Sequence, residues 1–183
     1  MQSAEAALAR LCDPQSEVSA HYLIAASGHV TQMVDETQRA WHAGAGQWRG
    51  FDDINSRSIG IELDNRGDHP FSEPQMVALE DLLIGIRSRW DIAAQDIIGH
   101  SDMAPGRKSD PGPRFDWARL ARQGHAGPTC PPAQVLPFEA AARAAGFTAA
   151  VDVTTLLDAT RLRFAPWRTG PLTPEDSALY HRV

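Results

Sequence analysis

The chain has 183 residues, with 17 Lys and Arg against 23 Asp and Glu, so its formal net charge is −6. Hydrophobic residues make up 43% and charged residues 22%, a balance that excludes a disordered chain and is typical of a globular protein. The acidic charge argues against a sequence-independent nucleic-acid binder, which needs a basic face. No apolar run is long enough to cross a membrane.

The first residues have neither a basic start nor a long apolar stretch, so they lack the pattern of a secretory signal. Residues 3–11 are rich in Ala and Leu, which predicts a helix with Ser3 as its N-cap and Pro14 beyond its end. Cys12 and Cys130 lie far apart, so they form no CxxC redox or zinc motif. Their spacing leaves a disulfide open, although we expect two free thiols.

Apolar and β-branched residues predict two strands, at 18–26 and 30–34, joined by a short hairpin connection. A third strand is predicted at 58–63, where apolar residues alternate with others. Ser72 caps a predicted amphipathic helix that extends to Trp90 and has a proline in its first turn.

A short buried strand is predicted at 96–99, followed by a Pro- and Gly-rich loop and a short helix at 115–122. Strands and helices are therefore interleaved, and one pair of strands forms an antiparallel hairpin. The fold class that this indicates is α/β, with a mixed central sheet flanked by helices.

The stretch 124–137 contains four prolines and two glycines, the composition of a linker. After it come an Ala-rich helix at 138–145, a helix capped by Asp152 and a short helix opened by Pro174. These helices form a small all-helical module near the lower size limit for an independent core. We therefore divide the chain into a first domain at 1–123, a linker at 124–137 and a C-terminal module at 138–183.

Three segments carry residues suited to catalysis. Glu62 lies near the end of a hydrophobic strand, where burial raises the pKa of a carboxyl toward that of a general base, although a solvent-facing carboxylate is the simpler alternative. His100 and Asp110 flank a loop stiffened by prolines, and their imidazole and carboxylate groups are ordinary zinc ligands. Such a pair is more often structural, but Lys108 is close enough to face the same pocket.

The third segment contains Trp41 and His42, which precede a glycine turn. An aromatic residue beside a histidine suits the wall of a substrate site. The alternative is a buried tryptophan next to a surface histidine.

Five segments follow one another in the chain: VSAHYLI, GHVTQMVDE, AWHAG, NSRSIGIEL and IIGHSDMAPGRKSDPGPRFDW. In this order they resemble the zinc-dependent N-acetylmuramoyl-L-alanine amidases, over about residues 1–122. That family shares its fold with phage amidase-type lysozymes and peptidoglycan recognition proteins. Residues after Pro137, including LRFAPWRTGPLTPED, resemble the small helical peptidoglycan-binding module often appended to such amidases.

The resemblance implies a role for each candidate. His100 and Asp110 match two of the family's three zinc ligands, so Zn²⁺ is the implied cofactor. Glu62 matches the general base and acid, and Lys108 matches the cation that stabilises the oxyanion. The implied substrate is the amide bond between N-acetylmuramic acid and L-alanine in peptidoglycan or muropeptides. The residues expected to bind substrate are Trp41, His42, Asn55 and Arg107.

His21 is a tempting third ligand. In the family, however, the residue before this histidine faces the site, and that residue is Ala20 here. Neighbouring strand residues face opposite ways, so we expect His21 to point into the packing on the far side.

The chain departs from the family at its start. The family's first zinc ligand is a histidine at the end of a strand that precedes the helix predicted at 3–11, and this chain begins after that strand. The resemblance therefore predicts a fold without its first strand, with unpaired edges in the sheet. Two explanations compete: a chain that starts at an internal methionine, or a complete chain with a defective zinc site.

These explanations lead to rival functions. The first is a zinc amidase; the others are a non-catalytic peptidoglycan-binding protein and an inactive truncated fragment. The partner in each active case is peptidoglycan or a muropeptide, and we expect a monomer with no nucleic-acid partner. The compartment stays open between the bacterial periplasm or cell envelope and the cytoplasm.

Overall fold

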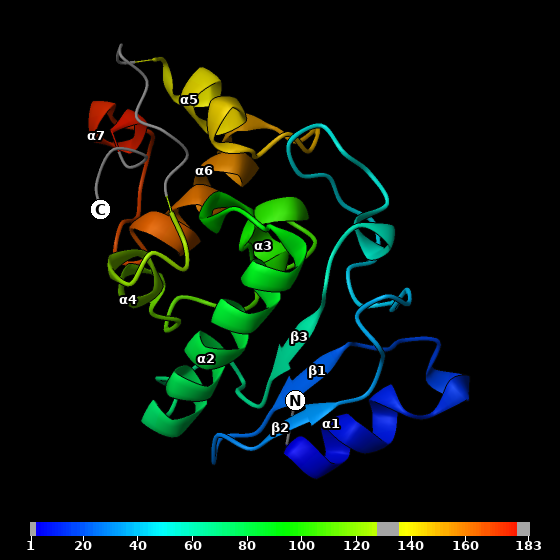
Figure 1. The fold of residues 1–183 in the computed structure, drawn as a ribbon. Helices are drawn as coiled ribbons and strands as arrows, with labels where there is room; N and C mark the ends of the chain where they lie inside the picture. Colours follow the sequence, from blue (N-terminus) through cyan, green and yellow to red (C-terminus); the bar gives the residue numbers. More distant parts are fainter. Residues whose placement is uncertain (1–2, 128–135, 179–183) are drawn as a thin grey trace.

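The sheet at the centre of the computed structural model, which describes residues 3–127 and 136–178, has three strands in the order β2-β1-β3 (Figure 1). The strands are β1 (Tyr22–Ile24), β2 (Val30–Gln32) and β3 (Ile61–Leu63). β2 runs antiparallel to β1, whereas β3 runs parallel to it, with Glu62 opposite Leu23. The sheet is therefore mixed, as predicted.

The described residues form these α-helices: α1 (Ala4–Leu11), α2 (Glu73–Trp90), α3 (His100–Met103), α4 (Trp117–Arg122), α5 (Phe138–Ala145), α6 (Val153–Phe164) and α7 (Pro174–Ser177). α1 and α2 contact the central strand β1, whereas α5, α6 and α7 form a group beyond α3 (Figure 1). None of the described helices is both long and apolar enough to cross a bilayer.

The helix boundaries follow from local capping chemistry. Ser3 accepts a hydrogen bond from the Ala6 amide at 3.2 Å and so caps α1, and Ser72 caps α2 in the same way. Gly146 ends α5 with a φ of 114°, a left-handed conformation that favours glycine. Asp152 accepts from two amides at the start of α6. All four helix ends match the sequence-based expectation.

Two groups of buried apolar side chains form the core. One lies between β1 and α2 and extends to α4, where Ile24, Leu79 and Leu120 are buried together. The other joins the first part of the chain to the C-terminal helices, because Trp48 and Met103 share it with Phe147 and Leu156. The C-terminal helices therefore pack on the first part through a common core.

Two expectations need correction. The strands are shorter than predicted, because only three residues of each have a hydrogen-bonded neighbour in the sheet. The strand predicted at 96–99 is wrong: residues 94–96 form a 3₁₀ turn, and Gly99 is the N-cap of α3. Ile97 is extended, but among the described residues no strand pairs with it, and its carbonyl accepts from a side chain instead.

β3 is an edge strand in the described sheet, because it pairs with β1 on one side and with no described strand on the other. Its residues Ile61–Leu63 line a cleft of about 1080 Å³. Cys12 is an exposed free thiol. Cys130 and most of the predicted linker lie outside the described residues.

Candidate functional site

The cleft beside β3 is lined by both polar and apolar side chains. All four residues that the sequence singled out for catalysis line it: Glu62, His100, Lys108 and Asp110. His100, Lys108 and Asp110 are near enough to Glu62 to influence the pKa of its carboxyl. Leu79 and Leu83 of α2 are among the apolar residues that line the same cleft. The structure therefore brings together side chains from β3, from α3 and from the loop after α3.

Glu62 is the middle residue of β3 and is half-buried. Burial raises the pKa of its carboxyl above the ordinary value, and the nearby Asp110 carboxylate adds to this rise, while His100 and Lys108 oppose it. A carboxyl with a raised pKa accepts and returns a proton near neutral pH more readily than a surface glutamate. This is the property that the sequence predicted for a general base.

His100 and Asp110 meet directly. His100 begins α3, and its Nδ1 makes a short hydrogen bond with Oδ2 of Asp110. Burial is the largest single influence on the pKa of His100 and lowers it, but the hydrogen bond with Asp110, the nearby carboxylates and the bond to the His42 carbonyl together raise the pKa above its ordinary value. Burial likewise raises the pKa of Asp110, but the hydrogen bond with His100, the nearby positive charges and a backbone hydrogen bond together lower it below its ordinary value. The two opposite shifts favour a cationic His100 beside an anionic Asp110.

The other nitrogen of His100 is fixed by the backbone. Nε2 lies 2.9 Å from the carbonyl oxygen of His42 and donates to it, because a carbonyl can only accept. This bond leaves Nδ1 facing Asp110. Histidines that bind metals have the same arrangement, with one nitrogen held by a carbonyl or carboxylate and the other free for the metal.

The donor types therefore fit zinc, but their number does not. An imidazole nitrogen and a carboxylate oxygen converge on one point, whereas a catalytic zinc takes three protein ligands. Across residues 3–127 and 136–178, no group of three or more His, Cys, Asp or Glu side chains is placed to hold a metal ion. These two donors alone do not make a complete catalytic zinc site.

Lys108 is the only lysine in the sequence, so the other 16 of the 17 basic residues are arginines. It lies on the loop between α3 and Asp110 and lines both the cleft and a smaller cavity of about 280 Å³. Its neighbour Arg107 lines the smaller cavity but is not among the residues that line the cleft, and its side chain donates to the carbonyls of Ala43 and Ala45. The contact of Arg107 with substrate stays a prediction.

Trp41 and His42 line the cleft together. The Trp41 side chain is exposed, and the guanidinium of Arg39 lies 4.0 Å from its ring centre. His42 is half-buried, and its Nε2 lies 3.2 Å from the Ser58 hydroxyl. Burial and the nearby His21 and His100 lower the pKa of His42 to about 4, so its ring is neutral at pH 7.

Asn55 is buried, and its Oδ1 accepts from the amides of His42 at 3.0 Å and Ala43 at 2.8 Å. The structure thus shows Asn55 bracing the chain that carries His42, whose carbonyl in turn holds His100. Its predicted contact with substrate stays a prediction.

His21 has the packing role expected of it. Its side chain is 1% exposed, its Nδ1 accepts from the Gly60 amide at 2.9 Å and its Nε2 donates to the Gln38 carbonyl at 3.0 Å. Both ring nitrogens are therefore used by the backbone.

Sequence reasoning missed two residues near the site. Ser58 bonds His42, and Asp102 accepts from the Gly99 amide next to His100. Asp102 is fully buried and pairs with Arg163 of α6. A buried acid three positions into a helix resembles an ordinary capping residue, so the sequence carried no signal for its partner.

Comparisons with known proteins identify the family of this chain. Residues 1–113 match the Amidase_2 family, described as N-acetylmuramoyl-L-alanine amidase. The chain is 40% identical over 170 residues to N-acetylmuramoyl-L-alanine amidase AmiD of Escherichia coli, which covers 84% of this chain and 59% of AmiD. It is 42% identical over 106 residues to 1,6-anhydro-N-acetylmuramyl-L-alanine amidase AmpD of Haemophilus influenzae, covering 57% of this chain and 58% of AmpD. The chain thus spans under two thirds of each of these two relatives.

Solved structures extend the similarity into the C-terminal helices. The complex of AmiD from Escherichia coli with anhydro-N-acetylmuramic acid-L-Ala-D-gamma-Glu-L-Lys has a TM-score of 0.84 at 31% identity, over 97% of this chain and 82% of that one. AmpDH3 from Pseudomonas aeruginosa with anhydromuramic pentapeptide also has a TM-score of 0.84 at 31% identity, over 99% of this chain and 86% of that one. The predicted fold class is confirmed, and the chain belongs to the Amidase_2 family of N-acetylmuramoyl-L-alanine amidases.

Proposed function

We propose that this protein hydrolyses the amide bond between N-acetylmuramic acid and L-alanine in peptidoglycan or muropeptides. The observation that supports this most strongly is that Glu62, His100, Lys108 and Asp110 line one cleft, where the other three influence the pKa of Glu62. The relatives solved with anhydromuropeptides support the same substrate class.

Within this proposal Glu62 transfers the proton. Its carboxylate takes a proton from the attacking water and returns it to the nitrogen of the leaving L-alanine. The raised pKa of Glu62 suits both steps, because the group must hold the proton between them. Lys108 supplies a fixed positive charge to the oxygen on which negative charge develops as the carbonyl becomes tetrahedral.

Zinc dependence is the finer part of the proposal. His100 and Asp110 contribute two ligands, and a third protein donor has to come from outside the described residues. When bound, zinc polarises the scissile carbonyl and lowers the pKa of its water.

The test is release of the stem peptide from a purified anhydromuropeptide, followed by mass spectrometry during a zinc titration. We expect the wild type to release the peptide and Glu62→Gln to be at least 100-fold slower, within the range of 10²–10⁴ for general acid–base catalysis. Glu139→Gln, a change at an exposed carboxylate on α5, is the matched control and should act like the wild type.

One observation favours a second candidate, a non-catalytic peptidoglycan-binding protein: no group of three or more side chains among the described residues is placed to hold a metal ion. Two measurements separate the candidates: retention on sacculi in the presence of a chelator, and peptide release during the zinc titration. Retention without peptide release at any zinc concentration would support the binding protein and contradict the amidase.

A further inference from the structure

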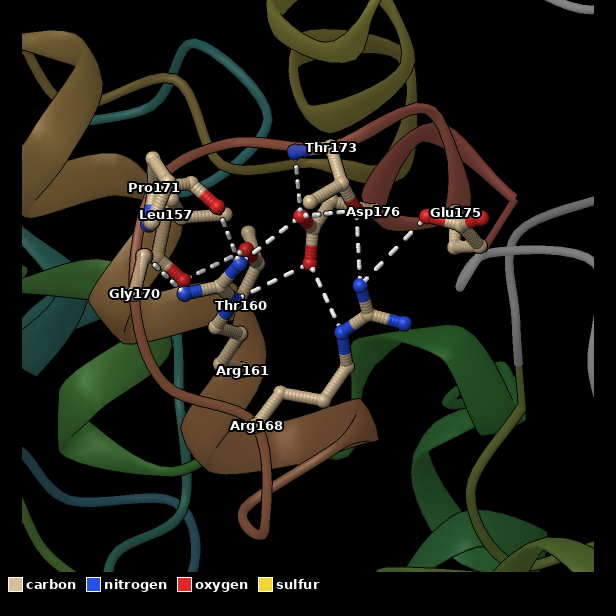
Figure 2. A network of polar contacts seen from close by, with 9 residues as sticks. All are labelled: Leu157, Thr160, Arg161, Arg168, Gly170, Pro171, Thr173, Glu175 and Asp176. Atoms are coloured by element: carbon tan, nitrogen blue, oxygen red, sulfur yellow. Dashed lines mark hydrogen bonds and ion pairs between the residues drawn. The ribbon is translucent and has the colours of Figure 1, made fainter.

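Helix α6 carries two buried arginines, Arg161 and Arg163, which bind different parts of the molecule. Arg161 stays within the C-terminal helices, where it makes two bonds to Asp176, at 2.9 and 2.8 Å, and one to the Gly170 carbonyl (Figure 2). Arg168 also points at Asp176. Arg163 lies two positions further along, on another side of the helix, and reaches into the first part of the chain.

Arg163 makes three contacts there. One nitrogen of its guanidinium donates to Oδ2 of Asp102 at 2.5 Å, and another donates to the Ile97 carbonyl at 3.0 Å. Its guanidinium carbon, Cζ, lies 4.0 Å from the ring centre of Trp117. The side chains of Arg163 and Asp102 are 4% and 0% exposed, so water does not compete for these bonds.

Asp102 connects Arg163 to Gly99, the residue before His100. The same Oδ2 accepts from the Gly99 amide at 2.8 Å. Its other oxygen, Oδ1, is buried and has no hydrogen-bond partner among the described residues. Asp102 therefore depends on Arg163 for its charge partner, since a buried carboxylate without one is strongly unfavourable.

The restrained segment is the one that carries the candidate ligands. Arg163 fixes the carbonyl of Ile97, and Asp102 fixes the amide of Gly99. His100 is next, and the Ser101 amide then donates to the backbone carbonyl of Asp110 at 3.0 Å. The position of both members of the His100–Asp110 pair thus depends on a segment held from α6.

We propose that Arg163 is a positioning residue for the candidate site, and that through Asp102 and the Ile97 carbonyl it sets where His100 and Asp110 lie relative to Glu62. The C-terminal helices then have a role in the chemistry of the cleft, beyond the wall binding predicted from the sequence. This inference rests on the proposed function only where activity is the readout.

The test compares Arg163→Met with Arg161→Met. Both changes remove a buried, ion-paired arginine from the same helix, so both lower the melting temperature. Only the first touches the segment before His100. Arg163→Lys is the conservative variant: it keeps the charge but cannot reproduce the forked pair of bonds to Asp102 and Ile97.

The primary readout is hydrogen exchange of the Gly99 and Ser101 amides by NMR in the metal-free chain. Each variant is measured at the same interval below its own melting temperature, with the Leu83 amide in α2 as the reference. We expect Arg163→Met to reduce protection of both amides at least tenfold relative to Leu83, Arg163→Lys to give an intermediate value and Arg161→Met to leave them unchanged. Equal effects of the two methionine variants, or no effect of Arg163→Met, would overturn the proposal.

A second readout is zinc affinity by competition with a chelator. Residues that hold a metal ligand in place are worth 10–100-fold in affinity, so Arg163→Met should weaken zinc binding at least tenfold and Arg161→Met should not. If Arg163→Met does not fold, Arg163→Lys decides by the same two measurements. If the variants show the expected exchange differences but the wild type releases no peptide, the proposed function is contradicted and this inference still holds. If the wild type releases peptide but Arg163→Met leaves the exchange of both amides unchanged, this inference is contradicted and the proposed function still holds.

Discussion

The indole of Trp48 packs edge-on against the ring of Phe147, with the ring centres 5.2 Å apart. Trp48 belongs to the first part of the chain and Phe147 follows α5, so this pair joins the two parts. Gly146 is tied to the same contact, because a Cβ at that position would lie 2.5 Å from the indole.

Removing this contact should destabilise the whole chain. Phe147 is fully buried, so Phe147→Ala should lower the free energy of unfolding by about 3–5 kcal/mol, measured by urea denaturation. Leu172→Ala, at an exposed residue, should cost less than about 0.5 kcal/mol. We also expect a single calorimetric transition in the wild type; two separate transitions would show that the C-terminal helices unfold on their own.

Glu62→Gln should stabilise the metal-free protein at pH 7 to 8. Burial raises the folded-state pKa of Glu62 above its unfolded value, so the stabilising protonated form is fully present at low pH and is lost as the pH rises through the folded pKa. Glutamine mimics the protonated form at every pH. The melting temperature of Glu62→Gln in chelator should therefore exceed that of the wild type at pH 8 and approach it at pH 4; a difference that is constant with pH would contradict this account.

His42 should make the fold sensitive to acid. Its folded-state pKa is lowered to about 4 from 6.5, so the stability it contributes is present above pH 6.5 and is lost as the pH falls through 4. At about 1.4 kcal/mol for each pKa unit, the loss is on the order of 3 kcal/mol. His42→Gln should reduce the difference in unfolding free energy between pH 7 and pH 4 by that order.

Lys108 can be modified selectively, because the sequence has no other lysine. Acetylation removes its charge, whereas reductive methylation keeps it. If Lys108 stabilises the oxyanion, acetylation should lower kcat by about 10²–10³, and methylation should lower it much less. In Lys108→Arg the terminal amine is the only amine left for the acetylating reagent, so a loss of rate there on acetylation would come from a group other than Lys108.

Two exposed tryptophans separate binding in the cleft from binding elsewhere. Trp41 is 54% exposed at the cleft, and Trp167 is 76% exposed on the loop after α6. Trp41→Ala should raise KM for an anhydromuropeptide with little change in melting temperature. Trp167→Ala should leave that KM unchanged and, if the C-terminal helices bind the wall, should weaken retention on sacculi.

Local chemistry made much of this molecule predictable from its sequence. Ser3, Ser72, Asp152 and Gly146 mark helix ends through bonds that span only a few residues. The extent of the strands was not predictable in this way, because it depends on partners distant in sequence. For the same reason residues 96–99 resembled a strand: Ile97 and Ile98 are apolar, but the Ile97 carbonyl accepts a hydrogen bond from a side chain of α6 instead of from a neighbouring strand.

The candidate site shows the same division. His100 and Asp110 are separated by one short loop, and the sequence placed them together. The support behind them was hidden: Asn55 holds the His42 amide, and Arg163 reaches Asp102 from a helix beyond the predicted linker. No local pattern marks a bond between such distant positions.

The shared core also has a consequence for synthesis on the ribosome. Trp48 is made well before Phe147, and at 5–20 residues per second the delay is roughly 5–20 s. During that interval the nascent chain has Trp48 and Met103 without the side chains that cover them. The segment around His100 likewise lacks its bonds to Arg163 until that residue has been made. The nascent chain therefore passes through a period in which this apolar surface is exposed to chaperones and to other nascent chains, and its cleft takes its final form only after Arg163 has been made.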